Sequence, residues 1–266
     1  MNINKDLLNG IYMARLRGKN LHETSYSSQA SKQASKGTYH MGETISKPFI
    51  NLHIPKTAGT SMRAALIDDF GADRVAFMMF ERQAVRASEL PFGVEEMDIE
   101  RRAARDAGQL ATFSARMSEA NRTIDYDAFS LSEIRSRDVD VATGHFNHKD
   151  ITQDIMDVPL VTILRDPLER AWSHFSQWRE AKGSIWWHSS DVIYSDDVSF
   201  EEFVTDQKLV NYQSQWLGEL SISVTGVTTN LSEFLEQVGV RPDTRIPLLN
   251  PGMHRGVPSL SNPSST

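Results

Sequence analysis

The segment His53-Ile54-Pro55-Lys56-Thr57-Ala58-Gly59-Thr60-Ser61 decides the fold, because it joins a predicted strand to a predicted helix. Residues 49–54 (FINLHI), which overlap the start of this segment, form a short apolar run that predicts a buried strand. After it, residues 61–66 (SMRAAL) have a helical composition. A strand, a loop of small residues and a helix in this order indicate the first unit of a parallel α/β sheet.

Further stretches of the chain alternate in the same way. Apolar, strand-like runs occupy residues 139–143, 160–164 and 221–227, and helical patterns occupy residues 168–182 and 231–238. Residues 82–138, which are charged and rich in alanine, predict helices and no strand. We therefore expect an α/β fold, a parallel sheet flanked by helices, with its sites at the carboxyl ends of the strands.

Composition bounds the domain organisation. The chain has 266 residues, enough for one large domain with appendages. Residues 25–47 are rich in Ser, Gln, Lys and Gly, so we expect residues 1–47 to form a partly flexible extension. The sequence predicts a single domain over residues 48–258 and a disordered tail over residues 259–266.

Charge and cysteine content exclude several classes of protein. The 28 Lys and Arg residues against 35 Asp and Glu residues leave a net charge of −7, which argues against a nucleic-acid binder. The chain has no cysteine, so disulfides, thiolate zinc sites, iron–sulfur clusters and a cysteine nucleophile are excluded. No stretch resembles a signal peptide or reaches the ~18 apolar residues of a membrane span, and we expect a cytoplasmic protein.

The loop after the first strand has the composition of an anion-binding turn. The first N–H groups of a helix lack partners within the helix, so small residues there let a phosphate or sulfate approach the backbone. Lys56 adds a mobile cation, and Thr57, Thr60 and Ser61 add hydroxyl groups. An ordinary turn with a capping Thr or Ser would not explain Lys56 together with Gly59. Because Lys56 precedes Gly59, the loop also differs from the common nucleotide-binding loop, which disfavours an ordinary kinase.

A second segment, residues 164–175 (LRDPLERAWSHF), follows the strand-like run at 160–164. Arg165 stands directly at the end of that strand, and Ser173 lies two helical turns further on. A guanidinium group and a hydroxyl group that converge from a strand end and a helix suit a second phosphate. The alternative is that Arg165 pairs only with a neighbouring carboxylate, Asp166 or Glu169.

Together the two segments resemble sulfotransferases that use 3′-phosphoadenosine 5′-phosphosulfate, in particular a soluble, bacterial-like member of the carbohydrate or Golgi-type branch. HIPKTAGTS is similar to the 5′-phosphosulfate-binding loop of that family, and RDPLERAWSHF is similar to its 3′-phosphate-binding segment. The likeness spans residues 48–255, with little to match in residues 73–138. It implies a sulfotransferase fold with a P-loop-like sheet. It also implies transfer of a sulfuryl group to an acceptor hydroxyl without a metal, with adenosine 3′,5′-bisphosphate as the product.

The resemblance implies a role for each residue of the two segments. The 5′-phosphosulfate would be held by Lys56, Thr57, Ala58, Gly59, Thr60 and Ser61. The 3′-phosphate would be held by Arg165 and Ser173, with Arg255 as a further basic contact.

The resemblance also implies a catalytic histidine. His145 follows Gly144 at the end of a predicted strand, as the catalytic histidine does in the related hexuronic-acid sulfotransferases. We expect a base with a pKa near neutrality, and His148 is the rival for this role. Lys56 would be catalytic as well, because it would stabilise charge on the leaving phosphate oxygen. His53 is expected to brace the loop.

Two other functions stay open at this stage, a divergent P-loop small-molecule kinase and a catalytically degenerate sulfotransferase-like binding protein. No metal site is expected. The arginines around residues 101–105 are interspersed with acids and predict a solvated helix face, not a basic groove. With the net charge of −7, this predicts a small or weakly charged acceptor, a carbohydrate or another small molecule.

Overall fold

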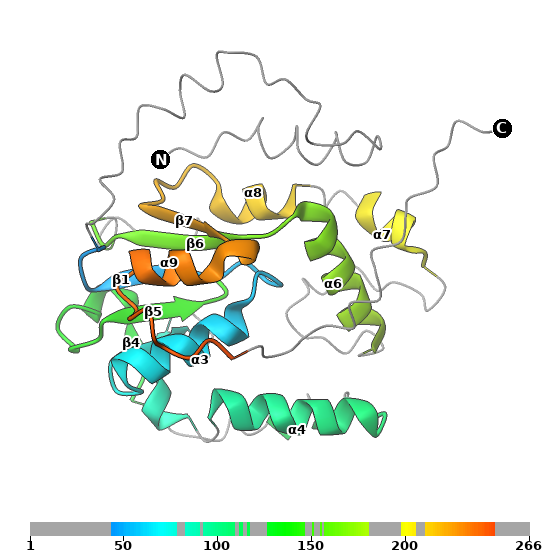
Figure 1. The fold of residues 1–266 in the computed structure, drawn as a ribbon, viewed down its shortest axis with the longest axis horizontal. Helices are drawn as coiled ribbons and strands as arrows, with labels where there is room; N and C mark the ends of the chain where they lie inside the picture. The colour runs from blue at the N-terminus through cyan, green and yellow to red at the C-terminus, as the bar shows by residue number, and fades with distance from the viewer. Residues whose placement is uncertain are drawn as a thin grey trace, which may run out of the picture.

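The computed structural model describes the central part of the chain, drawn in colour in Figure 1. The described residues are 44–78, 83–90, 93–109, 112–113, 116–117, 127–146, 151, 155, 157–180, 198–205 and 211–247. Most of the predicted extension, the predicted tail, His148 and Arg255 lie outside these residues. The boundaries 1–47, 48–258 and 259–266 therefore stay predictions.

A seven-stranded sheet in the order β4-β3-β2-β5-β1-β6-β7 forms the centre of the fold. Its strands are β1 (Phe49–Leu52), β2 (Val75–Met78), β3 (Gln83–Arg86), β4 (Phe129–Ser130), β5 (Val141–Gly144), β6 (Leu160–Leu164) and β7 (Val224–Val227). The neighbours from β2 to β7 pair in parallel, and β3 and β4 add an antiparallel edge. The predicted α/β class with a mostly parallel sheet is confirmed.

Helices cover both faces of this sheet (Figure 1). The helices with described bounds are α3 (Gly59–Phe70), α4 (Val94–Asp106), α6 (Pro167–Glu180), α7 (Phe200–Thr205), α8 (Tyr212–Leu217) and α9 (Leu231–Gln237). Short 3-10 turns occupy Ala87–Glu89, Leu131–Glu133 and Thr228–Asn230. Among the described residues no helix is long and apolar enough to cross a membrane.

The alternation of side chains along β1 explains the two cores. Phe49 packs with residues of α3 and α9 on one face, whereas Ile50 and Leu52 pack with residues of α8 on the other. Asn51 shares the first face, where its side-chain amide donates to the Thr143 hydroxyl at 2.7 Å. Because both faces are covered, the central strands are buried and mostly apolar, as expected for buried parallel strands.

The expectation that residues 82–138 contain no strand is wrong. Both antiparallel strands, β3 and β4, lie in this stretch, and the helix expected near residues 95–105 is confirmed as α4. Strand β3 has four residues and β4 has two, too few to show a period of two, and β4 finds its backbone partner, β3, more than forty positions earlier in the chain.

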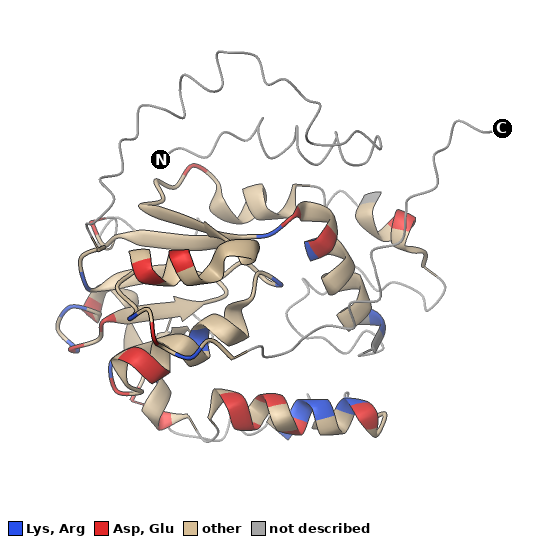
Figure 2. Cartoon of the chain, viewed as in Figure 1, with Lys and Arg blue, Asp and Glu red and all other residues tan. Residues whose placement is uncertain are grey.

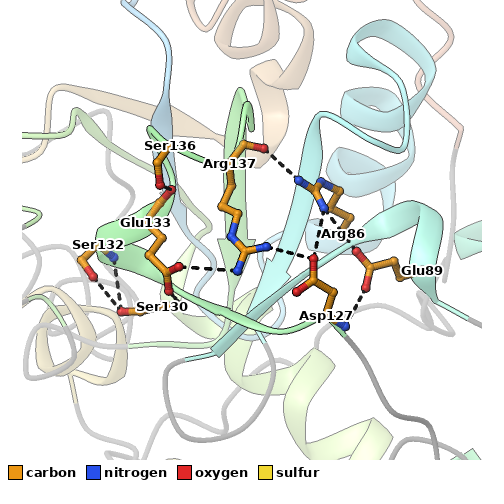
Figure 3. A network of polar contacts seen from close by, with 8 residues as sticks. All are labelled: Arg86, Glu89, Asp127, Ser130, Ser132, Glu133, Ser136 and Arg137. Atoms are coloured by element: carbon orange, nitrogen blue, oxygen red, sulfur yellow. Dashed lines mark hydrogen bonds and ion pairs between the residues drawn. The ribbon is translucent and has the colours of Figure 1, made fainter.

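Charged side chains in this stretch, which suggested helix surfaces, instead tie the edge strands to the chain around them (Figure 3). Arg86 of β3 donates to the backbone oxygen of Arg137 at 2.9 Å and lies 3.8 Å from the Asp127 carboxylate. Arg137 pairs with the same carboxylate at 2.9 Å and with Glu133 at 3.5 Å. The Glu89 carboxylate accepts from the Asp127 backbone N–H at 3.0 Å. This network holds together segments that are far apart in the sequence.

Helix α4 has the solvated surface that the mixed charges predicted, with Asp98 as its one buried residue. Asp98 is 2% exposed, and its carboxylate contacts the guanidinium groups of Arg101 and Arg102. These residues are spaced by three and four positions, so they occupy one face of the helix, and that face is turned inward.

Candidate active site

Three adjacent strands end at one place on the carboxyl edge of the sheet. Strand β1 pairs with β5 on one side and with β6 on the other, and Leu52 lies opposite both Gly144 and Thr162. The segments that follow these strands carry the Lys56 loop, His145 and Arg165. The tertiary structure therefore brings together residues that the sequence places about a hundred positions apart.

The loop between β1 and α3 has an unusual backbone. Lys56 (φ 74°) and Ala58 (φ 64°) are both left-handed without being glycine, a conformation that costs about 1–2 kcal/mol per residue. Thr57, whose side chain is fully buried, donates from its hydroxyl to the Ile54 carbonyl at 2.8 Å. Thr57 thus fastens the turn in this structure. Strained turns that the surroundings hold in place are found preferentially at functional sites.

Gly59, the first residue of α3, is required by packing. A Cβ at this position would lie 1.8 Å from atoms of the His53 ring. The sequence explained the small residue by the approach of an anion, but the structure gives the His53 ring as the neighbour that excludes a side chain. Thr60 and Ser61 follow in the first turn of the helix, where the backbone N–H groups lack helical partners.

His53 and His145 stack at the end of β1 and β5, with ring centroids 4.3 Å apart and planes at 29°. His53 is 8% exposed, whereas His145 reaches the surface. The ring of Trp216 from α8 lies 6.1 Å from the His145 ring at 75°. His53 braces the loop and the second histidine, as the sequence analysis expected.

The backbone fixes the tautomer of His145. Its Nδ1 lies 3.0 Å from the His53 carbonyl oxygen. A carbonyl oxygen only accepts, so Nδ1 carries the hydrogen and donates, and in the neutral ring Nε2 is the acceptor nitrogen. This is the arrangement that a histidine base requires.

The pKa of His145 is lowered from its ordinary value of 6.5. Desolvation of the ring is the main cause, and the positive charges of Arg63 and Lys56 add to it, while the hydrogen bond to the His53 carbonyl opposes it. Burial likewise holds the pKa of His53 well below its usual value. Both shifts favour the neutral form of the two rings at pH 7.

Arg165 is held through its backbone by Gln213 of α8. The Arg165 N–H donates to Gln213 Oε1 at 2.9 Å, and Gln213 Nε2 donates to the Arg165 carbonyl at 2.8 Å. The guanidinium group donates to the Lys56 carbonyl at 3.4 Å and lies 3.5 Å from the Glu169 carboxylate. The pairing with Glu169 that the sequence left open is thus present, while Asp166 accepts from the first N–H groups of α6.

One face of α6 links Arg165 to the Lys56 loop. Glu169, Ser173 and Gln177 recur every four residues, so they lie along one face of the helix. Glu169 contacts Arg165, and Gln177 Oε1 accepts from Lys56 Nζ at 2.8 Å. Ser173 lies between these two contacts and is half-buried. Lys56, Arg165 and Ser173 therefore lie on the same side of the carboxyl edge of the sheet.

Four residues of this site were not anticipated: Arg63, Gln177, Gln213 and Trp216. Gln177 lies two residues beyond the second segment and within the last turn of α6, where a position four residues after Ser173 could have suggested it. Arg63 lies on α3, and Gln213 and Trp216 lie on α8. No local sequence pattern marks these three as residues of the site. Among the described residues no group of three His, Asp or Glu side chains could hold a metal.

Replacement of Gln213 by Met tests the backbone contact at Arg165. The side chain has a similar length but makes neither hydrogen bond, so we expect a loss of about 1–3 kcal/mol in the free energy of unfolding. Urea denaturation measures this loss. Gln215→Met, on the exposed side of the same helix, is the control and should change stability by less than about 0.5 kcal/mol. Equal effects of the two substitutions would contradict the role of Gln213.

The lowered histidine pKa predicts a dependence of stability on pH. As the pH falls below about 6.5 the unfolded chain binds more protons at His145 than the folded chain, so stability falls as the pH is lowered. We expect the stability difference between the wild type and His145→Gln to change between pH 7 and pH 5, with the wild type losing more. Urea midpoints at the two pH values measure it. Parallel losses in the two proteins would show that the pKa of His145 is not depressed.

Comparisons with known proteins give a distant likeness of structure alone. No protein-family model matches the sequence, and no curated protein matches it either. A structure of retinol dehydratase in a complex with retinol and PAP matches with a TM-score of 0.33 and 15% identity over 74% of this chain and 61% of that chain. Retinol dehydratase in complex with androsterone and inactive cofactor PAP matches with a TM-score of 0.30 and 13% identity, over 71% of this chain and 57% of that chain. The chain thus spans about three fifths of the length of the proteins it resembles.

Proposed function

We propose that this protein transfers a sulfuryl group from 3′-phosphoadenosine 5′-phosphosulfate to the hydroxyl group of a small-molecule or carbohydrate acceptor. The observation that supports the proposal most is the meeting of the Lys56 loop, Arg165 and the neutral ring of His145 at the ends of three adjacent strands. Such a transfer needs cations that bind two anionic groups, and it needs a base in a fixed orientation, which the backbone provides here.

The basic residues divide between the two ends of the donor. Lys56 and the amino end of α3, with Thr60 and Ser61, would bind the 5′-phosphosulfate. Arg165 and Ser173 would bind the 3′-phosphate, since they share one side of the edge with Lys56. The left-handed backbone at Lys56 turns its carbonyl to the Arg165 guanidinium, which couples the two binding groups.

His145 would act on the acceptor. Nε2 accepts the proton of the acceptor hydroxyl while the oxygen of that hydroxyl forms a bond to sulfur. At the same time the bond between sulfur and the phosphate oxygen breaks. The bisphosphate leaves with that electron pair, and Lys56 stabilises its charge. A bound anion next to Lys56 offsets the positive charge that depresses the pKa of His145, so donor binding raises this pKa toward the range useful for a base.

Binding of adenosine 3′,5′-bisphosphate tests the donor site. We expect the bisphosphate to raise the melting temperature more than ATP with magnesium does. Lys56→Met and Arg165→Met should each weaken bisphosphate binding by ~10-fold or more, because each removes a charge-assisted contact. Calorimetry measures the binding. Arg135→Met is the control, since Arg135 is exposed and pairs with Asp157. A larger shift with ATP would favour a kinase, and binding of neither nucleotide would contradict the donor site.

Replacement of His145 separates chemistry from binding. His145→Gln should leave the affinity for the bisphosphate within about threefold and lower the rate of sulfuryl transfer by ~100-fold or more, the usual contribution of a positioned base. Transfer from labelled donor to a panel of hydroxyl acceptors measures the rate. An unchanged rate would remove His145 from the role of base. If the wild type binds the bisphosphate but transfers to no acceptor, the protein is a nucleotide-binding relative without activity.

A further inference from the structure

Two aromatic rings contact the imidazole of His145. The His53 ring stacks on it with centroids 4.3 Å apart, and the Trp216 ring of α8 stands at 75° to it with centroids 6.1 Å apart. Aromatic rings attract one another at separations of about 4.5–7 Å. His145 reaches the surface of the protein, where a side chain keeps one orientation only if its neighbours hold it. Trp216 is the contact to which the proposed transfer assigns no role.

Trp216 is itself held by Tyr212, one helical turn earlier on α8. The two rings lie 5.9 Å apart at 41°. Burial raises the pKa of the Tyr212 phenol, and the charge of Arg170 and a hydrogen bond from Trp216 oppose that rise. The guanidinium carbon of Arg170 on α6 lies 4.1 Å from the centre of the Tyr212 ring. Because Arg170 is buried, this row of contacts is anchored in the interior and ends at the His145 ring.

Gln213 fastens the same helix at a second point. Its side-chain amide bonds to both backbone groups of Arg165, at 2.9 Å and 2.8 Å. Gln213 precedes Trp216 by three positions, so the two side chains leave the helix on neighbouring positions. One short helix therefore binds the residue proposed to hold the 3′-phosphate and also contacts the proposed base. A movement of α8 would disturb both groups together.

Trp216 acts on the imidazole through shape and the exclusion of water, because α8 carries no acidic or basic residue (Figure 2). The charges that act on His145 come from Arg63 of α3 and Lys56 of the loop, and His53 is its titratable neighbour. A half turn of the imidazole about its Cβ–Cγ bond would put Cδ2 in the place of Nδ1. That turn would break the hydrogen bond to the His53 carbonyl, which alone fixes the tautomer.

We propose that Trp216 is a positioning residue for His145. Its ring holds the imidazole in the orientation in which Nδ1 donates to the His53 carbonyl and Nε2 carries the lone pair. The orientation matters because only the ring nitrogen without a hydrogen accepts a proton. The proposal rests on the proposed function, in which His145 is the base. Trp216 contacts neither donor nor acceptor there and acts through His145 alone.

NMR of the full chain with 15N-labelled histidine tests the proposal without turnover. The 15N shifts of an imidazole report which nitrogen carries the hydrogen, and comparison with His145→Gln assigns the signals. At pH 7 the wild type should show one tautomer, with the hydrogen on Nδ1. Trp216→Met should show both tautomers and a His145 pKa closer to its ordinary value, because water gains access to the ring. Trp216→Phe keeps an aromatic ring and should resemble the wild type.

Trp172→Met is the matched control. Trp172 is a partly buried tryptophan of α6 that packs against Phe175 and Phe200 in a separate aromatic cluster. Its replacement removes a ring of the same size and should leave the tautomer and the pKa of His145 unchanged.

Kinetics of the same variants separate positioning from binding. Trp216→Met should lower the rate of sulfuryl transfer by ~3–10-fold, the factor that one aromatic pair is worth, and leave the bisphosphate affinity within about twofold. Trp216→Phe should restore most of the rate.

Three results would overturn the proposal. The first is a single, unchanged tautomer in Trp216→Met, and the second is an equal change in Trp172→Met. The third is a Trp216→Met chain that does not fold, which would make the tryptophan structural. If the tautomer responds as expected but the wild type transfers no sulfuryl group, the proposed function fails and the positioning contact stands.

Discussion

The parallel pairing of β1 with β5 on one side and β6 on the other is the constraint on which the candidate site depends. The register that places Leu52 opposite Gly144 makes the next residues of the two strands, His53 and His145, neighbours, and their rings stack. The same register lets the His53 carbonyl accept from the His145 ring and so fixes its tautomer. On the other side, pairing with β6 brings Arg165 within reach of the carbonyl of Lys56.

Local packing then holds this edge in shape. Gly59 leaves room for the His53 ring, Thr57 fastens the strained turn, and Gln213 binds both backbone groups of Arg165. Gln177 holds the Lys56 side chain from α6. The catalytic and binding groups proposed here are therefore preorganised by side chains that would touch no substrate, which is how proteins usually support such sites.

Basic residues gather at the carboxyl edge of the sheet, although the chain as a whole is negatively charged. The protein carries a net charge of −7, yet Lys56, Arg165 and Arg63 meet around two neutral histidines. Desolvation is the main cause of the depressed histidine pKa values, Arg63 and Lys56 add to it, and an anionic ligand would offset the part that these two charges contribute. An overall charge averages over the surface, whereas a ligand responds to the few groups within a Debye length of about 8 Å.

The sequence by itself determined the α/β class, the strand-loop-helix unit at residues 49–66, the strand ends before His145 and Arg165, and the two segments that carry the resemblance. These features are encoded locally, in apolar runs and in residues adjacent to them. It did not determine β3 and β4, because these strands are too short to show a pattern and β4 pairs with a segment far away in the chain. Nor did it determine the contacts of Gln213 and Arg63 or the depressed pKa of His145. Only the tertiary structure decided these, because strand order, register and the helix packed on each face set the distances between groups that the chain itself keeps far apart.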